Sequence, residues 1–169
     1  MSLPDCPMSS PGTNVLARTV LARLTSRGET LATAESLTGG LIGELLTDVP
    51  GASASYLGGV IAYATRLKAT LAGVPEVLLA TDGPVAASTA RAMAAGIATR
   101  CGADWGLAVT GVAGPDSQDG HRPGEVHVAL VGPAGEKIIQ ERHVLTGDRS
   151  TIRRRTAEIA LALLADALE

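Results

Sequence analysis

A serine in a glycine-rich turn and a lysine further along the chain are the residues of this sequence best suited to chemistry. Ser36 lies in the segment Glu-Ser-Leu-Thr-Gly-Gly at 35–40, and Tyr63 and Lys68 follow downstream. A serine hydroxyl is a weak nucleophile that becomes useful only when a base and donors for an oxyanion stand beside it. Lys68 is one of two lysines among 14 basic residues, so a lysine at this position calls for an explanation.

Each of these residues also has an ordinary structural interpretation. Ser36 taken alone is typical of a helix N-cap, because its hydroxyl can accept a backbone N–H of the first turn. Glu35 beside it is interpreted as orienting the turn rather than as a base. Tyr63 taken alone is a strand residue with its hydroxyl at the edge of the core, and Lys68 is a solvated helix side chain. Whether these residues have a structural or a catalytic role depends on the helices and strands that position them.

The composition indicates one compact domain that does not bind nucleic acid. A chain of 169 residues can bury a core without disulfides. Aromatic residues make up 2% of it, which disfavours stacking on bases, and the formal net charge of -3 disfavours binding to a phosphate backbone. The arginine run at 153–155 is interpreted as a solvated helix face, with an anion contact as the alternative.

The cysteines and the first residues indicate where the protein works. Cys6 and Cys101 are isolated, without the paired spacing of a zinc site or a disulfide framework, so a reduced cytoplasmic setting is expected. Residues 1–14 contain neither a basic start nor an apolar run, so we expect neither a signal peptide nor a membrane partner. We predict a mobile leader over 1–14 and a single domain over 15–169.

Hydrophobic periodicity predicts alternating helices and strands. In chain order these are a helix at 15–26, a strand at 31–34, a helix at 41–49, a strand at 56–64, a helix at 86–101, strands at 105–112, 125–131 and 136–145, and a helix at 148–168. The segment Gly-Pro-Ala-Gly at 132–135 is typical of a hairpin turn. This pattern predicts an α/β fold, a three-layer α/β/α sandwich around a mixed, mostly parallel sheet with an antiparallel hairpin.

Five short blocks in a fixed order resemble a known family. They are Thr-Ala-Glu-Ser-Leu-Thr-Gly-Gly at 33–40, Pro-Gly-Ala-Ser at 50–53, Tyr63 with Lys68, Thr-Gly-Val-Ala-Gly-Pro-Asp at 110–116 and Gly-Asp-Arg at 147–149. From about residue 15 to its end, the chain resembles the CinA C-terminal domain family. It is similar to the stand-alone form, because it has no room for the larger nucleotide-processing domain that many members carry.

The resemblance implies an amidohydrolase that deamidates nicotinamide mononucleotide to nicotinic acid mononucleotide and ammonia, a step in pyridine nucleotide recycling. It implies that Ser36 is the nucleophile and that Tyr63 and Lys68 assist it. No histidine lies in the matched blocks, and a lysine made neutral by burial can take the serine proton and return it to the leaving nitrogen. We expect a Ser/Lys dyad, with Tyr63 relaying a proton or holding Lys68, and neither a metal nor a cofactor.

Ligands of such sheets bind where strands end and helices begin. The residues expected to contact a nucleotide substrate lie in three glycine-bearing turns: Thr38, Gly39, Gly40, Thr110, Gly111, Gly114 and Arg149. The backbone N–H groups at 38–40 are assigned either to the oxyanion or to the phosphate. Arg149 is a candidate for the phosphate, because arginine binds it in a bidentate manner.

Two departures from the family pattern leave alternatives open. Many members have Tyr-Ser-Asn before the lysine where this chain has Tyr63, Ala64 and Thr65, and a Val-Ser pair where it has Val85 and Ala86. One alternative is an amidase for another small amide. Another is a nucleotide-binding domain without turnover, linked to competence or DNA damage. A homo-oligomer is expected, by default a dimer.

Overall fold

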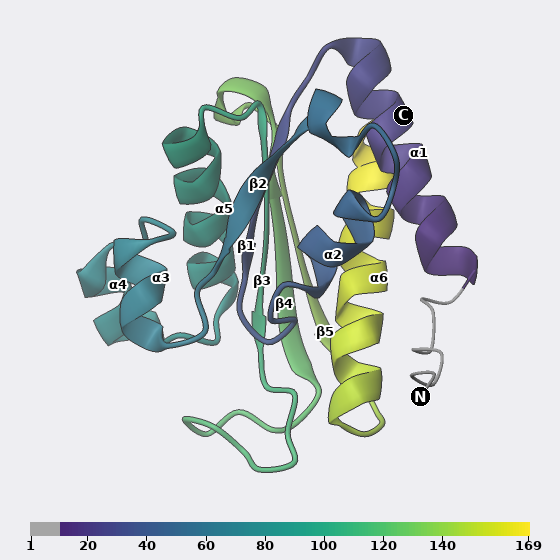
Figure 1. The fold of residues 1–169 in the computed structure, drawn as a ribbon. Helices are drawn as coiled ribbons and strands as arrows, with labels where there is room; N and C mark the ends of the chain where they lie inside the picture. The colour runs from purple at the N-terminus through teal and green to yellow at the C-terminus, as the bar shows by residue number, and fades with distance from the viewer. Residues whose placement is uncertain (1–10) are drawn as a thin grey trace, which may run out of the picture.

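Five strands form one sheet between two layers of helices (Figure 1). The computed structural model describes residues 11–169. Its elements in chain order are α1 (Pro11–Arg27), β1 (Leu31–Glu35), α2 (Leu41–Thr47), β2 (Tyr56–Ile61), α3 (Thr65–Thr70), α4 (Glu76–Asp82), α5 (Ala87–Cys101), β3 (Trp105–Gly111), β4 (Glu125–Val131), β5 (Ile138–Val144) and α6 (Arg149–Ala167). Two short 3-10 turns lie at Ala52–Ala54 and Pro133–Gly135.

The sheet is mixed, with the strand order β2-β1-β3-β4-β5. Strand β1 pairs in parallel with β2 and β3, whereas β4 pairs antiparallel with both β3 and β5. Four of the strands therefore run in one direction and β4 runs against them. The predicted α/β/α sandwich around a mixed sheet is confirmed, and β4 and β5 form the predicted hairpin.

Helices α1, α2 and α6 lie on one side of the sheet, and α5 with α3 and α4 lies on the other (Figure 1). The sheet has a hydrophobic core on each of its two faces, and alternate residues of β3 point into one or the other. Leu107 and Val109 pack on the α6 side, and Ala108 packs on the α5 side. The alanine-rich α5 approaches the sheet closely, because a Cβ added at Gly106 would collide with the carbonyl group of Ala94. Small residues on this side thus set the spacing between helix and sheet.

The element bounds differ from the predictions mainly at the start of the chain and around α3. Residues 1–10 of the expected leader lie outside the described residues, whereas 11–14 already belong to α1. The strand predicted at 56–64 ends at Ile61, so Tyr63 lies in the connection to α3. Helix α4 was not predicted, although Pro75 at its N-cap and Glu76 in its first turn are typical start signals.

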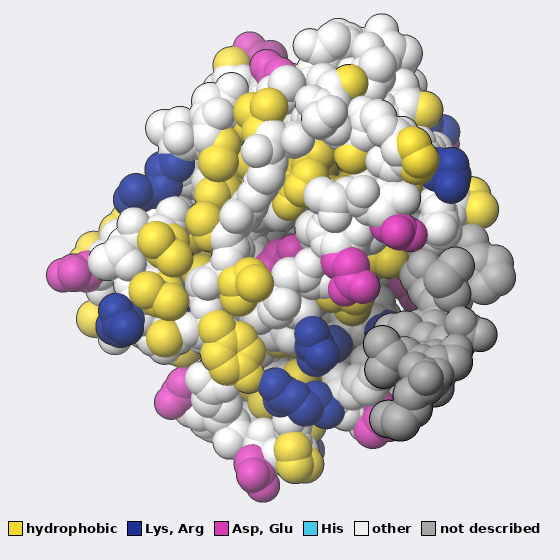
Figure 2. Space-filling model, in the orientation of Figure 1, with side chains coloured by type: hydrophobic (Ala, Val, Ile, Leu, Met, Phe, Trp, Pro, Cys, Tyr) yellow, Lys and Arg dark blue, Asp and Glu magenta, His cyan; other side chains and the backbone are white. Residues whose placement is uncertain are grey.

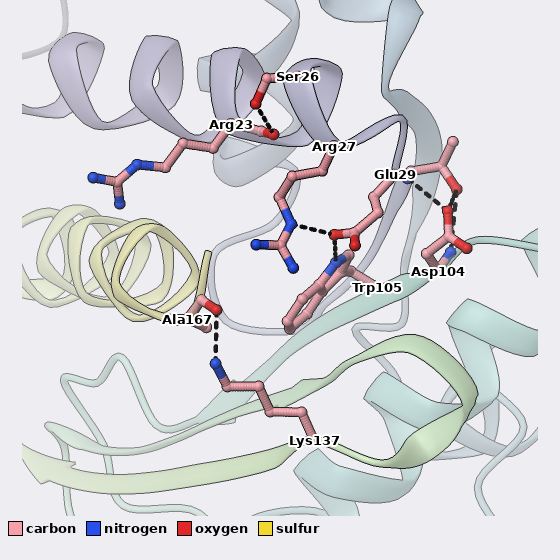
Figure 3. Close-up of polar contacts among 9 residues, drawn as sticks. Arg23, Ser26, Arg27, Glu29, Asp104, Trp105, Lys137 and Ala167 are labelled. Carbon is pink, nitrogen blue, oxygen red and sulfur yellow. Dashed lines mark hydrogen bonds and ion pairs between the residues drawn. The ribbon is translucent and has the colours of Figure 1, made fainter. Parts of the chain in front are cut away.

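Polar contacts fasten helices to the sheet at the end where β1 and β3 begin (Figure 3). The Trp105 indole N–H donates to a Glu29 carboxylate oxygen at 2.7 Å, and Arg27 donates to the same oxygen at 2.9 Å. Lys137 donates to the carbonyl oxygen of Ala167 at 2.7 Å, in the last turn of α6. A cation there complements the helix dipole. These contacts leave the opposite end of the strands for the site.

Candidate functional site

A pocket of about 290 Å³ opens at the carboxyl ends of β1 and β3. Seven of the predicted site residues line it: Ser36, Tyr63, Lys68, Thr110, Gly111, Gly114 and Arg149. Nine further residues complete the lining: Leu37, Ala64, Thr65, Pro84, Val85, Val112, Ala113, Asp116 and Gln118. Figure 2 shows basic side chains grouped over the lower end of the sheet and of α6, on the face turned to the viewer. The lining thus comes from five separate segments of the chain, at 36–37, 63–68, 84–85, 110–118 and 149.

Ser36 and Lys68 contact each other inside this pocket. The Lys68 Nζ donates to the Ser36 Oγ at 2.7 Å and to the carbonyl oxygen of Ala62 at 3.0 Å. Lys68 is 2% exposed and Ser36 is 6% exposed. Lys68 lies in the last turn of α3, and its side chain reaches back to the residue that follows β1. The two residues predicted to form a dyad are therefore hydrogen-bonded.

Burial lowers the pKa of Lys68 from its ordinary value of 10.5 to about 8. The cause is desolvation, because an ammonium group in the interior loses its hydration. While it is charged, the Lys68 ammonium donates to Ser36. Once it is neutral, the amine can accept the hydroxyl hydrogen of Ser36. The pair is thus suited to removing the serine proton in the mildly alkaline range.

Glu35 holds the turn that carries Ser36. Its buried carboxylate accepts hydrogen bonds from the backbone N–H groups of Gly40 at 3.1 Å, Ile42 at 3.0 Å and Gly43 at 2.9 Å. A carboxylate at the start of a helix satisfies amides that have no partner within the helix and also complements the helix dipole. Glu35 therefore orients the turn and the start of α2, in agreement with its interpretation from the sequence.

The structure directs two of the predicted binding amides away from the pocket. The N–H of Gly39 donates to the carbonyl oxygen of Ser36 at 3.1 Å, and that of Gly40 donates to Glu35. Positive φ angles of 62° and 98° let these glycines close the turn on itself. Of the described residues, Thr38, Gly39 and Gly40 are not among those that line the pocket. The assignment of Gly39 and Gly40 to an oxyanion or a phosphate is thus corrected.

Two other backbone amides follow Ser36 without a partner among the described residues, and one of them, that of Leu37, belongs to a residue that lines the pocket. Within residues 11–169, the N–H groups of Leu37 and Thr38 have no hydrogen-bond partner. Leu37 lines the pocket, and the sequence analysis missed it because a leucine carries no functional group of its own. Only the backbone conformation of the turn identifies its amide.

Tyr63 contacts Arg149 instead of Lys68. The Tyr63 hydroxyl accepts a hydrogen bond from the Arg149 Nη2 at 2.8 Å, and the Arg149 Nη1 donates to the carbonyl oxygen of Gly114 at 2.8 Å. Tyr63 is 58% exposed and lies at the rim of the pocket. The expectation that Tyr63 holds Lys68 is therefore corrected, since the carbonyl group of Ala62 does so.

The Thr110 hydroxyl anchors the segment that leads into α5. It donates to the carbonyl oxygen of Pro84 at 2.7 Å, and Thr110 is 1% exposed. Helix α5 begins after Ala86, whose extended backbone occupies the N-cap without a side-chain hydrogen bond. The hydroxyl of Ser88 donates to Asp82. Because Ala86 stands where the family pattern has a serine, it offers no hydroxyl and the start of α5 has no side-chain cap.

Arg153 supports the site, and the sequence analysis missed it. It was interpreted with its neighbours as a solvated helix face, but it is partly buried. Its guanidinium donates to the carbonyl oxygens of Leu37 at 3.0 Å and Thr38 at 2.6 Å. Arg153 lies four residues after Arg149, which places both on one face of a helix. This four-residue spacing from Arg149 is the feature of the sequence that could have identified Arg153 as a residue near the site.

The histidines lie with carboxylates. His121 and His127 contact the same oxygen of Glu125, at 3.2 Å and 3.3 Å. Within residues 11–169, no group of three His, Cys, Asp or Glu side chains is arranged to hold a metal ion. In the same part of the chain, no helix has the length and apolar character to cross a bilayer.

Comparison with known proteins relates the chain to one family. A model of the CinA C-terminal domain matches residues 13–168. A CinA-like protein of Frankia casuarinae is 51% identical over 145 residues, which cover 86% of this chain and 33% of that protein. A CinA-like protein of an Anaeromyxobacter species is 46% identical over 158 residues, covering 93% of this chain and 38% of that protein. The chain thus spans little more than a third of the length of these curated relatives.

Solved structures match over nearly their whole length. The competence/damage inducible protein CihA of Agrobacterium tumefaciens is 35% identical, with a TM-score of 0.88 over 99% of both chains. A competence-damaged protein (CinA) superfamily member from Klebsiella pneumoniae is 32% identical, with a TM-score of 0.87 over 92% of this chain and 97% of the other. The likeness therefore extends to the elements that carry the pocket.

Proposed function

The chain belongs to the CinA C-terminal domain family, and on that premise we propose that it is an amidohydrolase that converts nicotinamide mononucleotide into nicotinic acid mononucleotide and ammonia. The observation that carries the proposal is the buried contact of 2.7 Å between the Lys68 Nζ and the Ser36 Oγ. A serine that only capped a helix would direct its hydroxyl at an amide of its own turn. This serine instead contacts an amine that burial brings toward neutrality.

In the first half of the reaction, Ser36 becomes acylated. The neutral Lys68 takes the hydroxyl proton while the Ser36 Oγ attacks the carboxamide carbon of the substrate. The carbonyl oxygen becomes an oxyanion. The Lys68 ammonium then returns the proton to the amide nitrogen, the C–N bond breaks and ammonia leaves. Lys68 is neutral again at the end of this step.

In the second half, water releases the product. Lys68 takes a proton from a water molecule whose oxygen attacks the acyl carbon. The bond between that carbon and the Ser36 Oγ breaks, and the proton on Lys68 returns to Ser36. The product leaves as a carboxylate, with its second proton released to solvent. One lysine thus serves both half-reactions as base and then as acid.

The amide of Leu37 is the proposed donor to the oxyanion. Leu37 follows Ser36 directly and lines the pocket, and within residues 11–169 its N–H has no hydrogen-bond partner. The N–H of the residue after a nucleophilic serine is a recurrent oxyanion donor in serine hydrolases. Ala113 and Gly114 line the same pocket with amides that also lack a partner among the described residues, and are available for other polar groups of the substrate.

Arg149 is the proposed contact for the phosphate of the substrate. Its guanidinium is exposed at the rim, and two of its N–H groups bond to Tyr63 and Gly114. A guanidinium carries five N–H donors in all, so others remain for a phosphate oxygen. The pocket volume of about 290 Å³ lies just below the usual range for small-molecule sites, which begins at about 300 Å³. Tyr63 offers its ring as a wall of this pocket.

Two other functions stay in competition. A nucleotide-binding domain without turnover is favoured by the names of the solved relatives, which refer to competence and damage. An amidase for a different small amide is favoured by Ala64 and Thr65, which line the pocket with small side chains. Both would use the same cavity, and a single assay separates them from the proposed activity.

The test is ammonia release from nicotinamide mononucleotide by the purified chain and by Ser36→Ala. Ser36→Ala should lose roughly 10³-fold or more in kcat while keeping the unfolding temperature of the wild type. Ser53→Ala, which changes an exposed serine, is the matched control. Nucleotide binding without ammonia release would support the binding domain, and faster release from another amide would support the other amidase. Undiminished activity of Ser36→Ala would refute the nucleophile.

A further inference from the structure

We propose that Arg153 is a positioning residue that holds the carbonyl groups of the nucleophile turn, as Glu35 holds its amides. The proposal rests on the proposed function only for its kinetic readout. Arg153 lies in the second turn of α6, far along the chain from Ser36, and touches neither Ser36 nor Lys68 by hydrogen bond. It acts through the two peptide groups that follow Ser36.

The guanidinium of Arg153 binds two consecutive carbonyl groups of the turn. Its Nε donates to Leu37 at 3.0 Å and its Nη2 donates to Thr38 at 2.6 Å. A planar fork with fixed N–H directions specifies the orientation of both acceptors, which the single ammonium of a lysine does not do. The side chain also fills the space beside Gly39, where an added Cβ would lie 3.3 Å from the Nη2.

This turn needs such support because its own sequence is permissive. It contains two consecutive glycines at positive φ, and α2 beyond it is only 7 residues long. Glu35 holds the amides of Gly40, Ile42 and Gly43. Arg153 holds the carbonyl groups that precede them. A negative and a positive side chain therefore fix opposite polar edges of one short segment.

The orientation of the free amides follows from these contacts. In a trans peptide the C=O and N–H groups point in opposite directions. When Arg153 draws the Leu37 carbonyl toward α6, the N–H of Thr38 points away from α6. The Ser36 carbonyl and the Leu37 N–H belong to one peptide group. Because that carbonyl accepts a hydrogen bond from the Gly39 N–H, the Leu37 N–H points away from Gly39. Loss of Arg153 would release these planes and leave Lys68 and Ser36 intact but less well aligned with the oxyanion donor.

The chain offers a matched control on the same helix. Arg154 is exposed, whereas Arg153 is partly buried, so the two differ in environment and not in residue type. The flanking residues Ile152 and Thr156 are buried and keep α6 on the core. The variants to compare are therefore Arg153→Met, Arg153→Lys and Arg154→Met, with the unfolding temperature of each measured alongside activity.

Two readouts are used, one of which does not depend on the substrate. The first is kcat and KM for nicotinamide mononucleotide. The second is the rate at which an alkyl fluorophosphonate labels Ser36, detected by mass spectrometry. In that reaction the Ser36 Oγ forms a bond to phosphorus, fluoride leaves, and Lys68 takes the hydroxyl proton. It requires the aligned turn but no nucleotide.

Arg153→Met should lower kcat and the labelling rate by about 10- to 100-fold, with KM within about twofold of the wild type, because small misplacements of reacting groups cost this much. Arg153→Lys should recover only part of the rate, and Arg154→Met should match the wild type. Guanidinium added below denaturing concentrations should partly restore Arg153→Met. Because guanidinium supplies donors and not packing, this rescue distinguishes positioning from a general loss of structure.

The outcomes separate the two proposals. A wild type that is labelled at Ser36 but releases no ammonia refutes the proposed function and leaves Arg153 to be judged by labelling alone. Folded Arg153→Met with wild-type labelling and kcat overturns the positioning role. If Arg153→Met does not fold, Arg153→Lys decides, and full activity there overturns the role of the planar fork. A wild type that is not labelled overturns both proposals.

Discussion

Lys68 and Ser36 meet at 2.7 Å although 32 positions separate them in the chain. The register between β1 and β2 explains this contact. Glu35 pairs with Ile61 in the parallel ladder, and the N–H of Ala62 donates to the carbonyl oxygen of Glu35 at 2.8 Å. The residues that follow the two strands therefore lie side by side. Helix α3 then starts a few residues later and returns the Lys68 amine to that edge, where Ala62 also accepts from it.

The rate of ammonia release should rise with pH up to about 8 and then level off. Burial lowers the pKa of Lys68, so below that pKa most of the side chain is an ammonium that cannot accept the serine proton. Each unit below it should reduce kcat/KM by about tenfold. The measurement is kcat/KM between about pH 6 and about pH 9.5 at constant ionic strength. A flat profile across this range would contradict Lys68 as the base.

The stability of the wild type relative to Lys68→Met should increase as the pH rises from about 8 to 10.5. Below this window Lys68 is protonated in both the folded and the unfolded state, and the full cost of burying the charge is present. Within the window Lys68 loses its proton in the folded state while it is still protonated in the unfolded state. The unfolded state therefore binds more protons, and the free energy of unfolding rises with pH. The gain is about 3 kcal/mol over the window.

Urea denaturation of both proteins at the two ends of that window measures this gain. The comparison with Lys68→Met cancels the titration of other groups, because these are common to both proteins. A difference in unfolding free energy that does not change with pH would mean that Lys68 titrates alike in the folded and unfolded states. That result would contradict the lowered pKa of Lys68 and, with it, the role of Lys68 as the base.

Tyr63→Phe should raise KM for nicotinamide mononucleotide by about 3- to 10-fold and leave kcat nearly unchanged. The hydroxyl bonds to Arg149 and not to Lys68, so its loss releases the guanidinium that we propose for the phosphate. Steady-state kinetics of Tyr63→Phe, Arg149→Ala and the double variant measure this coupling. The double variant should resemble Arg149→Ala, because both changes remove the same interaction.

The corresponding nucleoside, which lacks the phosphate, is the control substrate for this prediction. Its KM should be the same for the wild type and for Tyr63→Phe, because Arg149 has no phosphate to contact. If Tyr63→Phe instead lowers kcat and shifts the pH profile, this would support the role of Tyr63 in relaying a proton, as expected from the sequence. The two outcomes differ in the kinetic constant that changes.

Much of the architecture was predictable because it depends on local pattern. Apolar residues at strand or helix spacing identified most elements to within a few residues, and the hairpin followed from its glycine-proline turn. Helix α4 could not be predicted in this way, because none of its 7 residues is buried and its sequence therefore has no strong hydrophobic periodicity. The family resemblance of the motifs likewise named Ser36, Lys68, Thr110 and Arg149 as site residues, and the structure places all four in the lining of one pocket.

The sequence by itself determined which chemical groups this protein has and, for most of them, which strand, helix or turn lies beside them. Only the tertiary structure decided which of them meet. The partner of Tyr63 is Arg149, the amides of Gly39 and Gly40 are used within their own turn, and Arg153 reaches the turn from α6. These relationships depend on strand register and on the direction of peptide planes and long side chains. Such quantities arise from packing between distant segments, and the spacing of residues along one chain does not contain them.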